Sequence, residues 1–135
     1  MLDLLIGGPG ETWAMVADTL TMVRSANPTC AGISLGVRIY PGTPLAEAFQ
    51  TGKRTPGLIG KPNGIAPAYF LSPALGRNPL ARIKKLVGTD ERFFLPAGKD
   101  EKDYNYNDNS VLQNAIDSGE RGAYWDILAR QRNPG

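Results

Sequence analysis

Apolar residues at the start of the chain predict a strand followed by an amphipathic helix. Residues 1–6 are apolar apart from Asp3 and end at a run of glycine and proline, as in a largely buried strand. Residues 11–26 then carry apolar side chains at helical spacing, namely Trp13, Val16, Leu20 and Val23. Asn27 and Pro28 end this helix, because the residue before a proline disfavours helical dihedral angles.

A second strand and a second helix follow. Residues 32–40 place apolar side chains at alternate positions, which predicts a strand. Pro44 suits the first turn of a helix, which we expect to run to about Gln50. Strands and helices that alternate with short links are typical of parallel strands joined by right-handed crossovers. The predicted fold class is therefore α/β.

The second half of the chain is less regular. Residues 51–67 contain seven glycines and prolines, which predicts a long loop. Residues 68–71 predict a short strand, and residues 90–94 a helical turn. Helices are expected at residues 78–87, 109–118 and 123–131, with inward positions Leu80, Ile83, Leu86, Val87, Val111, Leu112, Ala115, Ile116, Tyr124, Ile127 and Leu128. We therefore divide the chain into a βαβα segment with its loop, residues 1–67, and a mainly helical C-terminal extension, residues 68–135.

Length and charge exclude several classes of protein. A complete eight-fold (β/α) barrel needs about 250 residues, so a chain of 135 residues cannot close one alone. The formal net charge of +2 is too small to predict binding to nucleic acid or to a membrane surface. No apolar run approaches ~18 residues and no signal peptide opens the chain, so we expect a cytoplasmic protein.

The sequence contains no histidine and only one cysteine, Cys30. A serine triad needs an imidazole to accept the hydroxyl proton, and many zinc sites need a histidine ligand. One cysteine also forms no intrachain disulfide and no thiolate cluster. We expect no catalytic residue and no metal ligand in this chain, and we interpret Cys30 as a buried structural thiol.

Two glycine–proline turns follow the two predicted strands. The first, residues 7–12, leads into a helix whose free N–H groups suit an anionic or polar ligand, or it is a tight turn that Glu11 or Thr12 caps. The second follows Arg38 and Tyr40, which suit a carboxylate or phosphate and a stacked ring, or an ion pair and simple packing. Because the carboxyl ends of parallel strands share one edge, we expect both turns on the same rim.

Two further motifs fail on their spacing. Residues 57–61 resemble a phosphate-binding loop, but Thr55 stands where a glycine is required and Pro62 replaces the metal-binding hydroxyl. Residues 103–108 resemble a calcium loop, but Asp108 replaces its glycine and Asn114 its final glutamate. We interpret the second stretch as a solvated or capping loop.

Taken together, the motifs resemble a known enzyme family. GGPGET, SLGVRIYPGTPL, YFLSPAL, DERFF, DYNYNDN and RGAYWDIL occur in this order along nearly the whole chain. The combination resembles the later part of radical S-adenosylmethionine (radical SAM) enzymes, in a subgroup that often carries an N-terminal cobalamin-binding domain. The resemblance implies a partial or complete (β/α) barrel that holds a four-iron four-sulfur cluster and S-adenosylmethionine (SAM), whose reductive cleavage gives a 5′-deoxyadenosyl radical.

The resemblance also implies site residues. The GGPGE turn is similar to segments that line the adenosine site through backbone and apolar contacts, which gives the candidates Ile6, Gly7, Gly8, Pro9, Gly10 and Glu11. The RIYPGT segment matches the end of the next strand, so Arg38, Tyr40, Gly42 and Thr43 are expected to face the adenosine moiety or the substrate.

The chain departs from the family at the cluster. Family members hold it with C-x-x-x-C-x-x-C, whereas this chain has only Cys30, outside such a motif. We therefore expect a C-terminal portion of a radical SAM enzyme, an expressed fragment or the product of a truncated gene. It would contribute part of the SAM and substrate wall, and the isolated chain would hold no cofactor and be inactive. The alternative is a non-catalytic half-barrel module that associates with itself or with a chain bearing the missing barrel portion.

Overall fold

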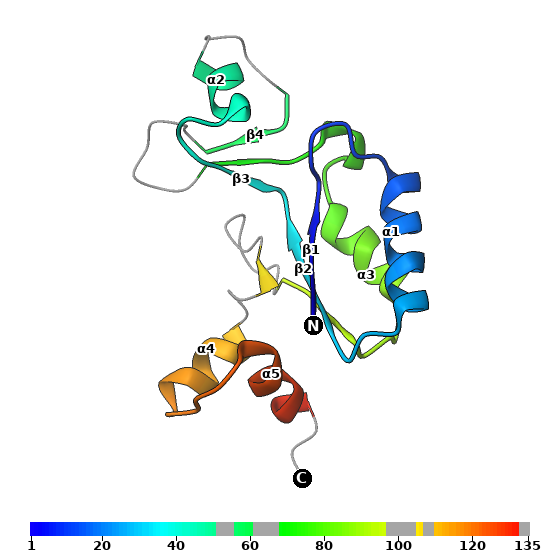
Figure 1. Ribbon diagram of the computed structural model, residues 1–135, viewed down its shortest axis with the longest axis vertical. Helices are drawn as coiled ribbons and strands as arrows, with labels where there is room; N and C mark the ends of the chain where they lie inside the picture. The colour runs from blue at the N-terminus through cyan, green and yellow to red at the C-terminus, as the bar shows by residue number, and fades with distance from the viewer. Residues whose placement is uncertain (51–55, 61–67, 97–104, 107–109, 133–135) are drawn as a thin grey trace.

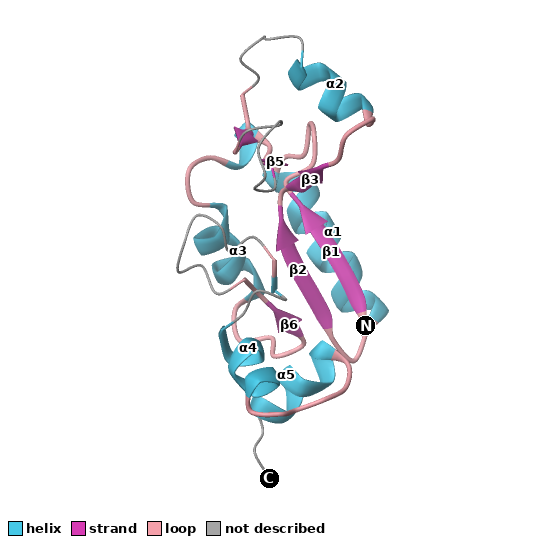
Figure 2. Cartoon of the chain, turned by 90° about the vertical axis from the view of Figure 1, so that its left-hand side faces the viewer, coloured by secondary structure: helices cyan, strands magenta, loops and turns pink. Residues whose placement is uncertain are grey.

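Two parallel strands form the centre of the fold in the computed structural model, which describes residues 1–50, 56–60, 68–96, 105–106 and 110–132. β1 (Leu2–Ile6) pairs with β2 (Ala31–Leu35) from Leu2↔Ala31 to Ile6↔Leu35. A third strand, β6 (Phe93–Phe94), joins the other side of β2, so the strand order of this parallel sheet is β1-β2-β6 (Figure 2). The predicted parallel βαβ unit is confirmed.

Two helices cover one face of the parallel sheet (Figure 1). α1 (Trp13–Ala26) begins at Thr12, whose hydroxyl accepts a hydrogen bond from the Met15 amide, and ends at Asn27 in the left-handed region. α3 (Pro79–Val87) begins at Asn78, whose side chain accepts from the Ala81 amide. Each of these caps satisfies an amide that lacks a partner within the helix.

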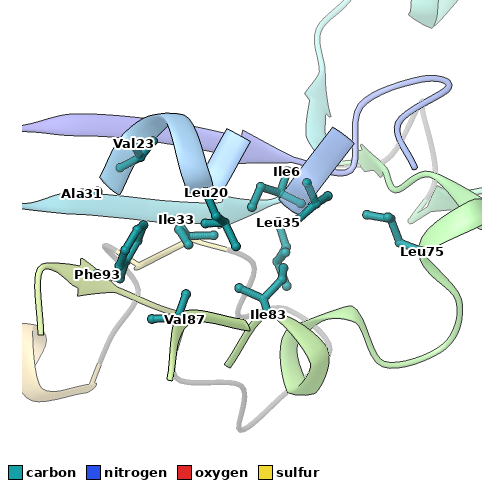
Figure 3. Close-up of a cluster of buried hydrophobic side chains, with 11 residues drawn as sticks. Ile6, Leu20, Val23, Ala31, Ile33, Leu35, Leu75, Ile83, Val87 and Phe93 are labelled. Atoms are coloured by element: carbon teal, nitrogen blue, oxygen red, sulfur yellow. The ribbon is translucent and has the colours of Figure 1, made fainter. Parts of the chain in front are cut away.

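The main core lies between these helices and the sheet (Figure 3). Ile6, Ile33 and Leu35 of the strands are at most 4% exposed. They pack against one stripe of each helix and against two residues outside these helices. The residues in contact include Val16, Leu20 and Val23 of α1, Ile83 and Val87 of α3, and Leu75 and Phe93. The helical stripe predicted for residues 11–26 is therefore confirmed.

β1 differs from the prediction of a largely buried strand. Only Ile6 is buried, and the Leu5 side chain is 65% exposed. The reason is topological, because among the described residues β1 lies at the edge of the sheet and has a neighbouring strand on one side only. β2, which has neighbours on both sides, is buried at all five positions.

The strand predicted over residues 32–40 divides at Gly36, whose φ is 75°. β3 (Val37–Ile39) leaves the parallel sheet and pairs antiparallel with β5 (Ala68–Phe70), which also pairs with β4 (Leu58–Ile59). We call β3-β5-β4 the small sheet. A Cβ atom at Gly36 would lie 2.9 Å from the Phe70 carbonyl oxygen, so this crossing requires glycine.

α2 (Pro44–Gln50) packs on the small sheet through Ala46 and Phe49. The rings of Phe49 and Phe70 lie 6.1 Å apart between centroids. β4 lies within the stretch that we predicted to be a long loop, of which residues 51–55 and 61–67 are outside the described residues. The predicted short strand at residues 68–71 is confirmed as β5.

The predicted helical turn at residues 90–94 is wrong. Asp90 and Arg92 lie in a turn, and the chain then forms β6, where the Ala31 amide donates to the Arg92 carbonyl oxygen at 2.8 Å. A two-residue strand has no periodicity of its own, and its pairing with β2 decides its structure. The second half of the chain therefore supplies a strand to the sheet of the first half.

α4 (Ser110–Asp117) and α5 (Tyr124–Arg132) form a hairpin on the second face of the parallel sheet (Figure 1). Leu112, Ala115, Ile127 and Leu128 pack with Cys30, Phe94 and Tyr106. The predictions that Val111 and Tyr124 face inward are wrong, since these side chains are 48% and 46% exposed. Leu86 of α3 is likewise 36% exposed.

Arg132 ties the last turn of α5 to β6. Its guanidinium donates hydrogen bonds to the carbonyl oxygens of Glu91 and Phe93, the latter at 2.9 Å. The Cζ atom of Arg132 also lies 4.0 Å from the centroid of the Phe94 ring. Charge, planar hydrogen bonding and ring stacking combine in this contact.

The structure is thus a mixed α/β fold with a parallel sheet, as predicted, whereas the assignment to a barrel fragment stays a prediction. The division at residues 67 and 68 also stays a prediction, although β5 and β6 both pair with strands of the first half. Within the described residues, no helix is long and apolar enough to cross a membrane.

Candidate functional site

The Gly7–Glu11 turn lies at the carboxyl end of β1 and leads into α1. Gly7 and Gly10 adopt φ values of 106° and 79°. The amides of Gly7 and Gly8 both donate to Oε2 of Glu11, the second at 3.2 Å. Of the two roles left open by the sequence, capping is therefore observed, with Glu11 closing the turn and Thr12 capping the helix.

Ser72 holds the same turn from the opposite side. Its amide donates to the Gly7 carbonyl oxygen at 2.8 Å, and its hydroxyl donates to the Glu11 carbonyl oxygen at 2.8 Å. The residue is 2% exposed. Ser72 lies in the motif YFLSPAL but is not among the predicted site residues, because its partners lie more than sixty residues away and no local spacing connects them.

The ends of β1 and β2 meet at two glycines. The Gly36 amide donates to the Ile6 carbonyl oxygen at 2.6 Å. A Cβ atom at Gly7 would lie 3.3 Å from the Gly36 nitrogen and would overlap the Leu71 side chain. Gly7 and Gly36 therefore allow the two strand ends and the segment after β5 to approach closely.

The outer part of the turn is open. Among the described residues, a Cβ atom at Gly8 would have only Val37 within 4 Å, at 3.9 Å, and one at Gly10 would have no neighbour within 4 Å. Pro9 and Gly10 are exposed. Ile6 and Gly7 are therefore packed inside the fold, and Gly8, Pro9 and Gly10 present backbone at its surface.

The second predicted group lies elsewhere. Arg38 belongs to β3, and Tyr40, Gly42 and Thr43 form the turn before α2. The Thr43 hydroxyl donates to the Tyr40 carbonyl oxygen at 2.8 Å and accepts from the Ala46 amide at 3.2 Å, which begins α2. These residues therefore shape a helix start on the small sheet.

The expectation of one shared rim is wrong for this group. The carboxyl end of β2 is Leu35, and Gly36 rather than Tyr40 contacts the Gly7–Glu11 turn. No hydrogen bond among the described residues joins Arg38, Tyr40, Gly42 or Thr43 to that turn. The structural interpretation of Arg38, an ion pair, is not found in the described part of the chain. Its Cζ atom lies 5.2 Å from the centroid of the exposed Tyr40 ring instead.

Polar groups on the second face of the parallel sheet lie below the turn. Asp3 and Leu5 pair with Gly32 and Ser34 across the two strands, so all four face away from α1 and α3. The Ser34 side chain is 9% exposed, and no hydrogen bond to its hydroxyl is found among the described residues. The Tyr106 hydroxyl donates to Asp3 Oδ1 at 2.8 Å.

The metal-ligand chemistry of the chain is limited. Cys30 is buried among the side chains of α4 and α5, and burial raises the pKa of its thiol. In the ranges that the structure describes, no three residues of the types His, Cys, Asp and Glu gather as a metal site. Residues 103–108 lie outside these ranges except for Asn105 and Tyr106. What the site offers a ligand is the exposed backbone of Pro9 and Gly10 and the Ser34 hydroxyl.

Comparisons with known proteins found similar solved structures of one enzyme. No protein-family profile matches the chain, and the curated proteins give no match. Two solved structures of the radical SAM methyltransferase TsrM from Kitasatospora setae are similar at 26% identity. The first, with tryptophan substrate and a SAM analog bound, has a TM-score of 0.66 and is matched over 98% of this chain.

The second structure, with cobalamin and a [4Fe-4S] cluster bound, has a TM-score of 0.63 and is matched over 96% of this chain. The present chain spans 33% and 32% of the length of the two TsrM chains. By its fold, the chain is therefore similar to a part of a radical SAM methyltransferase.

Proposed function

We propose that this chain forms the part of a radical SAM fold that lines the SAM and substrate site, without the segment that binds the cluster. The observation that carries the proposal is the junction of Gly7 and Gly36. Two parallel strands end there beside an open glycine turn, and the match to the SAM-analog complex covers 98% of the chain. Ligands of open and closed α/β sheets bind at the carboxyl ends of the strands.

The cluster does not fit the residues of this chain. Three thiolates normally hold a four-iron cluster that also binds SAM, and the sequence supplies one cysteine. That cysteine lies buried beneath the α4–α5 hairpin, away from the Gly7–Glu11 turn. Any radical chemistry at this turn therefore depends on cysteines supplied by another polypeptide segment, and we propose that the chain alone is inactive.

SAM fits the chain better than the cluster does. The Ser34 hydroxyl, for which no partner is found among the described residues, and the exposed backbone of Pro9 and Gly10 offer hydrogen-bonding groups, while the Glu11 carboxylate already holds the Gly8 amide. SAM supplies the 5′-deoxyadenosyl radical when it is bound beside a reduced cluster. In our proposal Ile6, Gly7 and Glu11 support this backbone wall from within, and Arg38, Tyr40, Gly42 and Thr43 shape the neighbouring lobe.

Titration of the ¹⁵N-labelled chain with SAM, followed by NMR, tests the proposal. We expect shifts of the amides of Gly8, Gly10 and Ser34 that saturate with SAM, and none at Gly119 or Gly122 in the α4–α5 connection. Ser34→Ala should weaken the binding, and Ser118→Ala, an exposed serine of the hairpin, is the matched control. Absence of any shift at millimolar SAM, or shifts confined to the hairpin, would contradict the proposal.

A second candidate function is association through β1. The Leu2 amide donates to Cys30 and the Ile6 carbonyl accepts from Gly36, so the backbone groups of Asp3 and Leu5 face away from β2. The exposed side chains of Leu2 and Leu5 lie along the same edge. Such an edge pairs readily with a further strand, either from a second copy or from a chain with the missing barrel portion.

Light scattering coupled to size-exclusion chromatography tests this candidate. A dimer that Leu5→Lys converts to a monomer would support self-association through the edge, because a charged side chain on an edge opposes pairing. Leu86→Lys, on the exposed side of α3, is the matched control. A wild-type monomer over the whole concentration range contradicts the self-association version.

A further inference from the structure

We propose that Ser72 is a positioning residue, which together with Glu11 sets the shape of the Gly7–Glu11 turn from the small sheet. The proposal deepens the function proposed above in that it names what controls the SAM-facing turn. Its geometry stands on hydrogen bonds within the chain and needs no ligand.

The backbone of the turn is bonded on both sides. Glu11 accepts from the amides of Gly7 and Gly8 with one carboxylate oxygen. Ser72 donates to the carbonyl oxygens of Gly7 and Glu11 with its amide and its hydroxyl. Each of these two residues therefore spans the turn, one from within it and one from a segment sixty-one positions away.

Ser72 is itself placed by the small sheet. It follows β5 after one residue, Leu71, whose amide donates to the Gly57 carbonyl oxygen at 2.8 Å. Its own carbonyl oxygen accepts from the Leu75 amide at 3.0 Å and so begins the 3-10 helix η1 (Pro73–Leu75). Any displacement of β5 relative to the parallel sheet therefore moves Ser72 and the turn together.

Close packing leaves Ser72 little freedom. The residue is 2% exposed, and the neighbouring Leu71 fills the space where Gly7 would carry a Cβ atom. Loss of the hydroxyl leaves the half-buried Glu11 carbonyl oxygen without its donor, whereas the backbone bond from the Ser72 amide persists. Ser72→Ala thus removes one defined contact and keeps the chain path.

Amide hydrogen exchange of the uncomplexed chain tests the proposal. In Ser72→Ala and in Glu11→Ala we expect exchange at Gly7 and Gly8 to accelerate by about tenfold, as for loss of one net hydrogen bond. Ser72→Thr, which keeps a hydroxyl, and Glu11→Gln, which keeps one acceptor oxygen, should restore much of the protection. Ser25→Ala, which loses an exposed hydroxyl bond on α1, is the matched control.

The amides of Ile33 and Leu35 in β2 report global unfolding in the same experiment. Acceleration confined to the turn supports the proposal, and equal acceleration in β2 overturns it, because a merely structural role would open both. Unchanged exchange at Gly7 and Gly8 in Ser72→Ala also overturns it. If either alanine variant fails to fold, Ser72→Thr and Glu11→Gln test the proposal instead. Protection of the Gly7 and Gly8 amides must then be lower than in wild type while protection in β2 is unchanged, and unchanged protection at the turn overturns the proposal.

SAM titration separates this proposal from the proposed function. If exchange at the turn accelerates in Ser72→Ala but the wild-type chain shows no SAM-dependent shifts, the positioning role of Ser72 is supported and SAM binding is contradicted. If the wild-type chain and Ser72→Ala show the same shifts at the same SAM concentration, and exchange at the turn is unchanged, SAM binding is supported and the positioning role of Ser72 is contradicted.

Discussion

The ring of Tyr106 lies against the backbone of Gly32, in the middle strand of the parallel sheet. A Cβ atom at Gly32 would come within 2.6 Å of Cζ of that ring, so glycine is required for the ring to reach the sheet. The ring then extends to Asp3, which its hydroxyl bonds at 2.8 Å. A residue of the polar segment near the C-terminal helices thereby covers part of the sheet face opposite α1 and α3.

This contact predicts a destabilised Gly32→Ala variant. We expect a loss of about 1–3 kcal/mol in the free energy of unfolding, because the buried Tyr106 ring must move. Urea denaturation measures it, and Gly8→Ala serves as the control, since the added Cβ atom would have no neighbour closer than 3.9 Å among the described residues. In the double variant Gly32→Ala/Tyr106→Ala the two losses should be less than additive, and full additivity would contradict the overlap.

Asp90 predicts an acid-sensitive contribution to stability. A hydrogen bond from Arg92, together with one from Arg24, lowers the pKa of Asp90 from 3.8 to about 2. Because the pKa of Asp90 is lower in the folded than in the unfolded chain, its carboxylate stabilises the fold above about pH 4. This stabilisation is lost as the pH falls toward 2. Both arginines are partly exposed, so we expect Asp90→Asn to cost about 1 kcal/mol at pH 7.

Urea denaturation at pH 7 and at pH 3 checks this. The difference between wild type and Asp90→Asn should shrink at the lower pH, because there the Asp90 carboxylate of the unfolded chain takes up a proton while that of the folded chain is still mostly ionised. Asp126→Asn, which breaks an exposed ion pair with Arg130, should have a small effect at both pH values. A constant difference for Asp90→Asn would mean that its charge is not responsible.

Cys30 predicts slow thiol chemistry and no iron–sulfur cluster in the isolated chain. Burial raises the pKa of the thiol, so less thiolate is present at neutral pH, and the side chain is 6% exposed. We expect a disulfide reagent to react at pH 8 at least about tenfold more slowly with the folded chain than with the unfolded chain. Anaerobic iron–sulfur reconstitution followed by absorption spectroscopy completes the test, and a stable cluster near one per chain would refute it.

The contacts of Arg132 predict that attachment of the end of α5 to β6 requires a guanidinium and not only a positive charge. Arg132→Ala should lower the free energy of unfolding by about 1–2 kcal/mol, since it removes two hydrogen bonds and the contact with Phe94. Arg132→Lys should recover only part of the loss, because an ammonium lacks the planar fork. Arg130→Ala, which removes exposed ion pairs, is the control, and equal losses at the two positions would contradict the assignment.

Local pattern was enough to predict much of the fold. Spacing and backbone preference predict the stripe of Val16, Leu20 and Val23, the Asn78–Pro79 start of α3 and the end of β1 before Gly7. Helices with a single apolar stripe are specified mainly by neighbours three and four residues away. Their positions therefore needed no knowledge of the rest of the chain.

The errors arise where distant residues decide. Alternation continues through Gly36 as if one strand ran from 32 to 40, and only the approach of Phe70 shows why the strand turns there. β6 has two residues and is set by its pairing with β2. In the candidate site, the GGPGE motif predicted the Gly7–Glu11 turn. Ser72 was not predicted, because no sequence spacing links Ser72 to Gly7.

The bond from Arg132 to Phe93 also limits how the parallel sheet can grow. The Arg92 carbonyl oxygen faces β2, so the Phe93 carbonyl oxygen faces the outer side of β6, where it accepts a hydrogen bond from the Arg132 guanidinium. The Phe93 amide on the same side donates to the Asp90 carbonyl oxygen. Among the described residues, the opposite edge at β1 has no such cover. The association that we propose through β1 would therefore add one strand on that side of the sheet, because Arg132 covers the edge at β6.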